Sequence, residues 1–123
     1  MAAKNCAWRI LSRRSVVVLI KEGNVKTVLV RYQTTPEHAA ANEAAIHAVF
    51  DELRARAPAG FRYTSYRTDD ATFVHVATVD APVNPLFALP AFAAFQRQLE
   101  GHFLERPVTL ELRAVDQYGG GVP

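Results

Sequence analysis

The pattern of apolar and polar residues predicts one α+β domain over residues 25–118, with elements in the order β-α-β-β-α-β. The strand segments are rich in β-branched and aromatic residues, and Asp69-Asp70, between the second and third, is a hairpin turn signal. The four predicted strands are residues 26–33, 61–68, 72–79 and 107–118. We therefore expect an antiparallel sheet with two helices on one of its faces.

The two segments with helical spacing each have a start signal. In Thr35-Pro36-Glu37, Thr is an N-cap residue, Pro takes the first helical position and Glu supplies an acid in the first turn. Pro58-Ala59-Gly60 ends this helix, and its apolar stripe is Ile46, Val49, Phe50, Leu53 and Ala57. Asn84-Pro85 and then Pro90 predict a short turn followed by a second helix. The expected buried face of the second helix is Phe92, Phe95, Leu99 and Phe103.

The two predicted sheet faces differ in polarity. A two-residue turn at Asp69-Asp70 pairs Tyr66 with Phe73 and Thr64 with His75, and paired residues share a face. The more apolar face is the expected floor for both helices and holds Phe61, Tyr63, Ser65, Val74, Val76, Val108, Leu110 and Leu112. The other face is mixed and holds Leu29, Arg31, Arg62, Thr64, Tyr66, Phe73, His75 and Ala77. Because large exposed patches with aromatic residues usually mark interfaces, we predict that a second copy covers the mixed face in a homodimer.

Composition and charge narrow the classes of function. The chain of 123 residues has the length of one domain, and half of it is apolar, as in ordinary soluble proteins. Its net charge of +2 comes from scattered Lys and Arg, so no nucleic-acid partner is expected. The longest strongly apolar run, residues 16–20, is far too short for a membrane-spanning helix. The single cysteine, Cys6, excludes an internal disulfide and a Cys-rich metal site, and it fits a cytoplasmic location.

Both ends of the chain are expected to lie outside the domain. In residues 1–24 the apolar residues show no sustained helix or strand periodicity. Lys21-Glu22-Gly23 can be encoded by a purine-rich ribosome-binding sequence. Since a GTG codon for Val25 can initiate translation, we expect the natural protein to begin there. The alternative is an extra strand at residues 16–20. Residues 119–123 begin with Gly119-Gly120-Gly121 and predict a flexible tail.

Three segments carry a resemblance to a known family: residues 26–38 (KTVLVRYQTTPEH), 60–67 (GFRYTSYR) and 84–99 (NPLFALPAFAAFQRQL). In the order of their helices and strands and in the residue pattern of these elements, they resemble the antibiotic biosynthesis monooxygenase family over about residues 25–118. The resemblance implies a ferredoxin-like monomer in a dimeric α+β barrel. It also implies a monooxygenase that acts on an aromatic or quinol-type small molecule. Such an enzyme uses no metal or tightly bound organic cofactor, because the substrate itself supplies electrons to oxygen.

The same family includes haem-degrading enzymes, which place an Asn, a Trp and a His around the haem. Residues 25–118 contain no Trp, since Trp8 lies in the N-terminal segment, so haem degradation is not expected. The polyphenol-oxidising branch relies on a Trp and an Asn that have no evident counterparts here. A non-catalytic dimeric module that binds a small ligand or a protein partner is therefore the alternative function.

Four residues are candidates for a ligand site. A neutral His75 could accept a proton from a phenolic substrate, or it could be a hydrogen-bonded histidine inside the dimer interface. Arg31 could hold an anionic substrate, or it could pair with Glu111 across the sheet. Tyr63 and Tyr66 could line a pocket for an aromatic ligand, although core and interface packing explains them equally well.

One further pattern concerns metal ions. Glu43, His47 and Asp51 are spaced four residues apart on one face of the first helix. No second cluster of ligating residues accompanies them in the sequence. We therefore interpret them as a solvated face with weak charge pairing and expect no metal site.

Overall fold

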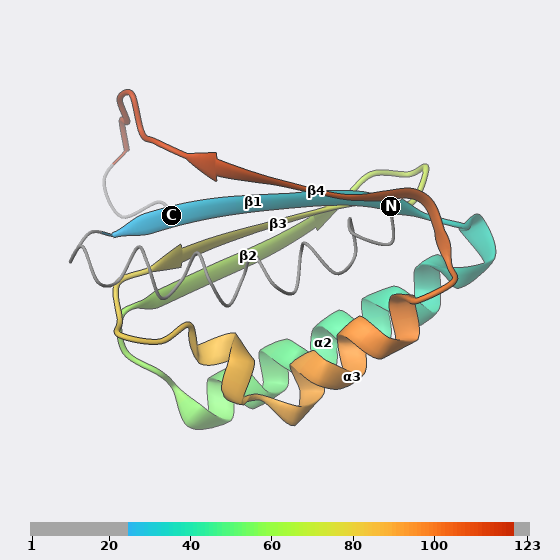
Figure 1. Cartoon of the computed structure of the whole chain (residues 1–123), viewed down its shortest axis with the longest axis horizontal. Coiled ribbons are helices and arrows are strands. Elements are labelled where there is room, and N and C mark those ends of the chain that lie inside the picture. The colour runs from blue at the N-terminus through green and yellow to red at the C-terminus, as the bar shows by residue number, and fades with distance from the viewer. Residues whose placement is uncertain (1–24, 120–123) are drawn as a thin grey trace.

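The structure is a computed structural model and describes residues 25–119, so the predictions for residues 1–24 and 120–123 lie outside the described residues. The elements are β1 (Lys26–Thr34), η1 (Pro36–His38), α2 (Ala39–Arg56), β2 (Phe61–Arg67), β3 (Thr72–Val79), η2 (Pro85–Ala88), α3 (Pro90–Leu99) and β4 (Phe103–Leu112). The strands form one antiparallel sheet in the order β2-β3-β1-β4, and both helices lie against the same face of it (Figure 1). The predicted α+β fold with two helices on one sheet face is confirmed.

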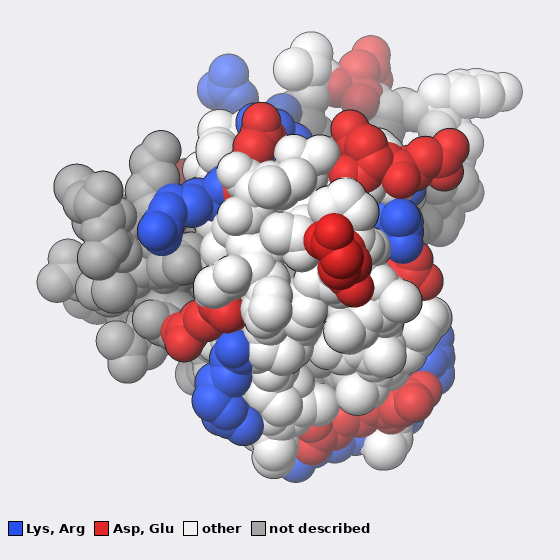
Figure 2. All heavy atoms as spheres, turned by 90° about the vertical axis from the view of Figure 1, so that its right-hand side faces the viewer, with Lys and Arg blue, Asp and Glu red and all other residues white. Residues whose placement is uncertain are grey.

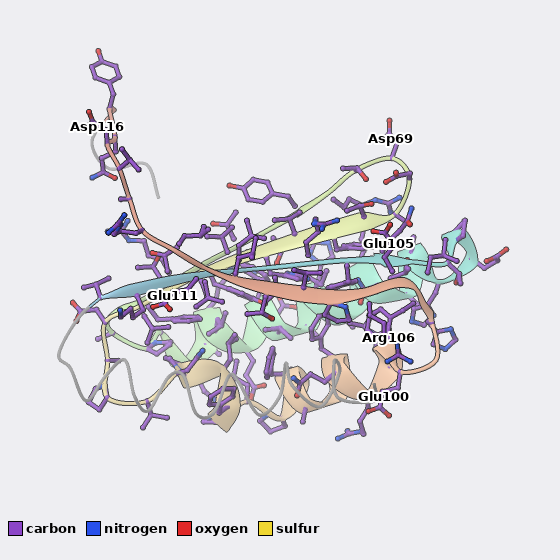
Figure 3. The ribbon with its side chains drawn as sticks, turned by 45° about the horizontal axis from the view of Figure 1, so that its top comes forward. Asp69, Glu100, Glu105, Arg106, Glu111 and Asp116 are labelled. Carbon is purple, nitrogen blue, oxygen red and sulfur yellow. The ribbon has the colours of Figure 1, made fainter. Side chains whose placement is uncertain are left out.

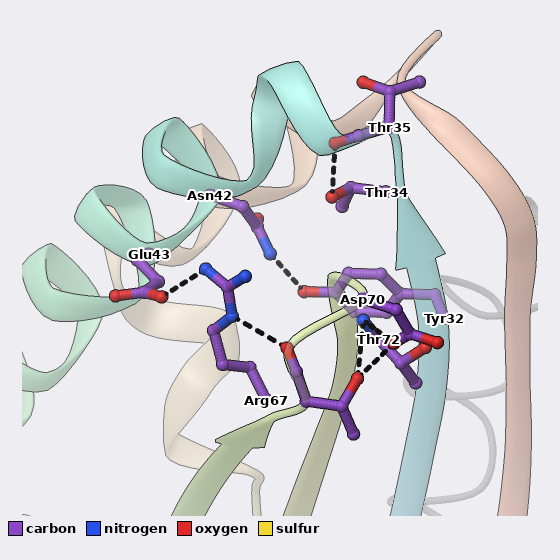
Figure 4. A network of polar contacts seen from close by, with 9 residues as sticks. Tyr32, Thr34, Thr35, Asn42, Glu43, Arg67, Asp70 and Thr72 are labelled. Atoms are coloured by element: carbon purple, nitrogen blue, oxygen red, sulfur yellow. Dashed lines mark hydrogen bonds and ion pairs between the residues drawn. The ribbon is translucent and has the colours of Figure 1, made fainter.

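The hairpin between β2 and β3 has a three-residue loop instead of the predicted two-residue turn. The Thr68 N–H donates to the Thr72 carbonyl at 2.8 Å, and Ala71 has a left-handed backbone with φ of 66°. The Asp70 carboxylate accepts from the Thr68 hydroxyl and from the Thr72 N–H and so braces the loop (Figure 4). Loops of three residues with a left-handed third residue are a common hairpin type. The predicted register is therefore wrong by one residue, and Ser65 lies opposite His75.

This shift reverses the predicted faces of β3. Its residues on the helix side are Phe73, His75, Ala77 and Val79, and all four are buried. Val74 and Val76 lie on the other side, since a shift of one residue exchanges the faces of a strand. Leu110 of β4 also lies there, opposite Leu29 of β1. We call this side the open face, because no helix of the described residues covers it. Its apolar residues are Leu29, Tyr66, Val74, Val76, Val108, Leu110 and Leu112.

The two helices start and stop close to their predicted positions. The helix α2 follows a short 3₁₀ turn that has Thr35 as N-cap and Pro36 in its first position. The buried residues of α2 include Ile46 and Val49, as predicted, but Ala57 is exposed and ends the helix with a φ of 46°. In α3 the predicted buried residues are confirmed: Phe92, Phe95 and Leu99. No helix in residues 25–119 is long and apolar enough to span a membrane.

The strand β4 begins and ends earlier than predicted. Gly101, with a φ of 83°, turns the chain directly after α3, so Phe103 belongs to β4 and not to the helix. The predicted strand started at Pro107, and proline cannot donate to a strand ladder. Pro107 is tolerated inside β4 because this strand is at the edge of the sheet and its pairing with β1 is irregular near Gln33.

Gly60 makes the tight connection between α2 and β2 possible. Its φ is 71°, and the Asp80 N–H donates to its carbonyl at 2.7 Å. A Cβ atom at this position would lie 2.2 Å from the Asp80 carbonyl oxygen. Only glycine therefore fits here, both for its backbone conformation and for the space available.

Candidate functional site

A pocket of about 240 Å³ lies between the C-terminal half of α2 and the start of β2. Its lining is mostly apolar and consists of Phe50, Leu53, Arg54, Ala57, Pro58, Phe61 and Tyr63. The Tyr63 ring stacks on that of Phe50 at a centroid distance of 5.1 Å and on that of Phe61 at 5.7 Å. Because aromatic side chains favour stacked partners, this wall suits a flat aromatic ligand.

Arg54 brings a positive charge to the pocket. Its side chain is mostly exposed and lies 3.3 Å from the Asp51 carboxylate. The guanidinium carbon also lies 5.8 Å from the centroid of the Phe50 ring, within the range of a cation–π contact. An exposed pair of this kind is weak and leaves Arg54 available to an anionic group on a ligand.

His75 lies behind the Tyr63 wall, with 6.0 Å between the two ring centroids. The imidazole is almost completely buried, and both of its nitrogens have partners. Its Nδ1 is 2.6 Å from the Ser65 hydroxyl oxygen, and its Nε2 is 2.8 Å from the Tyr32 hydroxyl oxygen. The Phe95 ring packs edge-on against the imidazole at 5.6 Å.

Hydrogen bonds continue from Tyr32 through both helices. The Asn42 amide nitrogen donates to the Tyr32 hydroxyl at 2.8 Å (Figure 4). The Gln98 amide nitrogen donates to the Asn42 carbonyl oxygen at 2.7 Å, and the Gln98 carbonyl oxygen lies 2.5 Å from His38 Nε2. We call this series the polar chain: Ser65, His75, Tyr32, Asn42, Gln98 and His38.

Burial keeps the centre of the polar chain uncharged. Desolvation lowers the pKa of His75 to about 3, so the imidazole is neutral at physiological pH. Desolvation raises the pKa of the Tyr32 phenol far above its usual value, although the hydrogen bond from Asn42 opposes part of this effect. The pKa of Tyr63 is raised by the same cause, against a smaller effect of Ser65. The site thus offers oriented neutral donors and acceptors behind an aromatic wall.

The structure separates the four predicted site residues into two groups. His75 and Tyr63 lie together on the helix side, whereas Arg31 and Tyr66 lie on the open face. The predicted pairing of Arg31 with Glu111 is wrong. Arg31 lies 3.6 Å from Glu105, and Glu111 pairs with Lys26 at 3.1 Å; both acids are labelled along β4 in Figure 3.

Sequence reasoning missed Asn42 and Gln98, which connect the two helices to the sheet. Asn42 is completely buried and lies four residues before Ile46, on the same stripe of α2. That spacing was the available signal, because a polar residue on a buried stripe needs hydrogen-bond partners. Gln98 directly precedes the buried Leu99 at the end of α3 and gave no comparable signal.

The predicted solvated face of α2 carries ion pairs. Glu43 pairs with Arg67 of β2 at 2.6 Å, and Asp51 pairs with Arg54. Figure 2 views the molecule from the end where the β2–β3 hairpin and η1 lie, and side chains of both charge signs are interspersed there. In residues 25–119 no group of three or more His, Cys, Asp or Glu side chains is arranged to hold a metal ion.

No family model matches the sequence, and no curated protein matches it. Solved structures do share the fold. The protein Rv0793 of Mycobacterium tuberculosis is 18% identical with a TM-score of 0.62, and the match covers 78% of this chain and all of that one. A Caulobacter crescentus protein described as a "putative antibiotic biosynthesis monooxygenase" is 17% identical with a TM-score of 0.60, over 76% of this chain and 92% of that one.

A third structure, from Jannaschia, is described as a dimeric ferredoxin-like protein of unknown function. It is 14% identical with a TM-score of 0.52, and the match covers 74% of this chain and 100% of that chain. At these identities the similarity concerns the fold. Residues 25–119 therefore have the ferredoxin-like fold of proteins described as antibiotic biosynthesis monooxygenases, as the sequence resemblance implied.

Proposed function

We propose that the protein binds a small phenol- or quinol-type molecule in the pocket between α2 and β2 and oxygenates it without a metal or organic cofactor. The observation that carries this proposal is the aromatic pocket wall of Phe50, Phe61 and Tyr63, backed by His75. The shared fold with proteins described as monooxygenases supports the reaction type.

The pocket favours a compact ligand that carries a negative charge. Its volume of about 240 Å³ is below the range of about 300–1,000 Å³ found for drug-sized ligands, which suits a molecule with one or two rings. Arg54 can pair with a carboxylate or phenolate on such a molecule.

The proposed reaction balances with oxygen as the only co-substrate. A phenol and O₂ give a quinone and one water, since the ring loses its O–H and one C–H hydrogen and gains one oxygen atom. All four electrons that reduce O₂ come from the substrate, and one oxygen atom enters the quinone while the other leaves as water. The pocket would hold the ring in a fixed orientation. His75 does not line the pocket, so its proposed role is to support Tyr63 and Ser65 from behind.

Oxygen consumption and ligand binding, measured over a panel of phenols and quinols with and without a carboxylate, test this proposal. An Arg54→Gln variant is expected to bind the charged compounds up to about fivefold more weakly, which corresponds to about 1 kcal/mol for an exposed ion pair. The matched control is Arg56→Gln, because Arg56 is on the same helix but does not line the pocket. No binding and no turnover across the panel would refute the proposal.

The same proposal includes a homodimer in which a second copy covers the open face. Tyr66 and Leu110 are 56% and 50% exposed there, and the Jannaschia neighbour is described as dimeric. Leu110→Lys is expected to give a monomer in light scattering at micromolar concentration. The control Val83→Lys changes another exposed apolar residue, which lies just before η2, and is expected to leave the dimer intact.

A non-catalytic binding module is the second candidate, and the packing between helices and sheet favours it. Phe92 and Phe95 are buried there, and the Phe103 ring packs edge-on against Tyr32 at 5.6 Å. These rings occupy the space in which a deeper site would have to lie. Tight binding of an aromatic compound without oxygen consumption would identify the protein as this kind of module.

A further inference from the structure

A backbone carbonyl fixes the orientation of the Gln98 amide in the polar chain. Gln98 Nε2 lies 2.9 Å from the carbonyl oxygen of Phe95, one turn earlier in α3. A carbonyl oxygen only accepts, so this end of the Gln98 amide must be its NH₂ group. The Gln98 carbonyl oxygen therefore points to His38, whose Nε2–H donates to it.

The orientation of Gln98 determines the orientation of Asn42. The NH₂ group of Gln98 lies 2.7 Å from the Asn42 amide, so the Asn42 atom that it contacts must be the acceptor Oδ1. The Asn42 NH₂ group then faces the Tyr32 hydroxyl at 2.8 Å and donates to its oxygen. The Tyr32 oxygen accepts this bond and lies 2.8 Å from His75 Nε2, so we assign the Tyr32 hydrogen to the bond with His75.

The last step sets the tautomer of His75. Its Nε2 accepts from Tyr32, so the single proton of the neutral imidazole is on Nδ1 and is donated to the Ser65 oxygen at 2.6 Å. The Ser65 hydroxyl hydrogen is then free to donate to another acceptor. The two amides orient the chain but do not conduct protons, because neither amide nitrogen has a basic lone pair to accept one.

We propose that Gln98 and Asn42 are positioning residues that hold His75 in the tautomer with its proton on Nδ1. Towards Ser65, His75 is then a donor. It does not act as a base that activates the Ser65 hydroxyl, although the two side chains are in direct contact. This goes beyond the proposed function and holds whether or not a ligand is oxidised. Any chemistry assigned to His75 would have to begin from this protonation state.

Imidazole nitrogen NMR of the full chain tests the inference directly. The protein is labelled with ¹⁵N-histidine, and long-range ¹H–¹⁵N spectra at pH 7 report which nitrogen of each of the four histidines carries the proton. For His75 we expect a protonated Nδ1 and an unprotonated Nε2. In Gln98→Met the anchor to Phe95 is lost, so Asn42 can turn over. We expect the ratio of the Nδ1–H to the Nε2–H tautomer to fall at least tenfold.

A second variant and a control complete the experiment. Asn42→Asp presents a carboxylate that accepts from Tyr32, so His75 should switch to the tautomer with its proton on Nε2. Gln96→Met makes the same chemical change on the same helix outside the polar chain and should leave the spectrum of His75 unchanged. A wild-type His75 with its proton on Nε2, or an unchanged ratio in folded Gln98→Met, would overturn the inference. If a variant does not fold, the wild-type spectrum alone decides.

Discussion

Replacing Tyr32 by Phe removes one hydroxyl from the centre of the core and leaves the ring in place. The side chain is fully buried, and its ring packs against Phe73, His75 and Phe103 at centroid distances of 5.4–5.6 Å. The variant keeps these ring contacts. It therefore tests the hydrogen bonds of the hydroxyl, which include one to His75 and one to Asn42.

The expected cost follows from the partners that are left behind. Without the hydroxyl, His75 Nε2 and the Asn42 NH₂ group are buried without this hydrogen bond, and a buried unsatisfied polar group costs about 1–3 kcal/mol. Both groups are affected, and at about 1–2 kcal/mol for each we expect a loss of about 2–4 kcal/mol in the free energy of unfolding. For a domain of this size, 1 kcal/mol shifts Tm by about 4–8 °C, so Tm should fall by roughly 10–30 °C.

Urea unfolding followed by circular dichroism measures this loss. The control is Tyr118→Phe, which removes a fully exposed hydroxyl and should stay within about 0.5 kcal/mol of wild type. In a double-mutant cycle with Asn42→Ala, contacting residues should show a coupling energy of about 0.5–3 kcal/mol. A loss below about 0.5 kcal/mol in Tyr32→Phe, together with zero coupling, would refute the view that the polar chain stabilises the core.

Three further predictions concern stability. Gly60→Ala should destabilise more than Gly101→Ala, because both have positive φ but only the Cβ at Gly60 meets the Asp80 carbonyl oxygen; equal losses in Tm would contradict this. The pKa of His75 is lowered from its ordinary value of 6.5 to about 3 by burial in the folded protein. At a pH between these two values, His75 therefore takes up a proton only when the chain unfolds. The free energy of unfolding should therefore fall by up to about 1.4 kcal/mol per pH unit from pH 6.5 towards 3, and His75→Phe should reduce this slope. Ala57→Gly should raise Tm by a few degrees, since glycine adopts the left-handed backbone at the end of α2 at lower cost, and an unchanged Tm would contradict that reason.

The limits of sequence reasoning are clearest at the β2–β3 hairpin. The bounds of β3 were predicted to the residue, because β-branched and aromatic residues mark that strand plainly. The loop was misjudged because Ala71, which is not a usual left-handed residue, takes the third position. Because the loop has one more residue than predicted, His75 lies in the core beside Tyr32 and Ser65 and not on the predicted mixed face. The composition of the candidate site therefore depended on a backbone conformation that the local residue types do not favour.

The helices were easier to predict than the contacts between them. The spacing of Ile46, Val49 and Phe95 identifies the buried faces of α2 and α3 without any knowledge of the sheet. The hydrogen bond between Asn42 and Gln98 joins positions 56 residues apart. Such a pairing depends on how the helices pack against each other, which the helical period alone does not determine.

The two edge strands limit the ways in which this sheet can associate with other chains. In β4, Pro107 has no N–H to offer a neighbouring strand, and Glu105 and Arg106 carry opposite charges just before it (Figure 3). In β2, Arg62 and Arg67 are exposed along the other edge. Proline, charge and irregular pairing at an edge all oppose the addition of a further strand. Sideways growth into continuous sheets, the route to fibrils, is thereby disfavoured. In the proposed homodimer, the apolar contact between copies would then form on the broad side of the sheet.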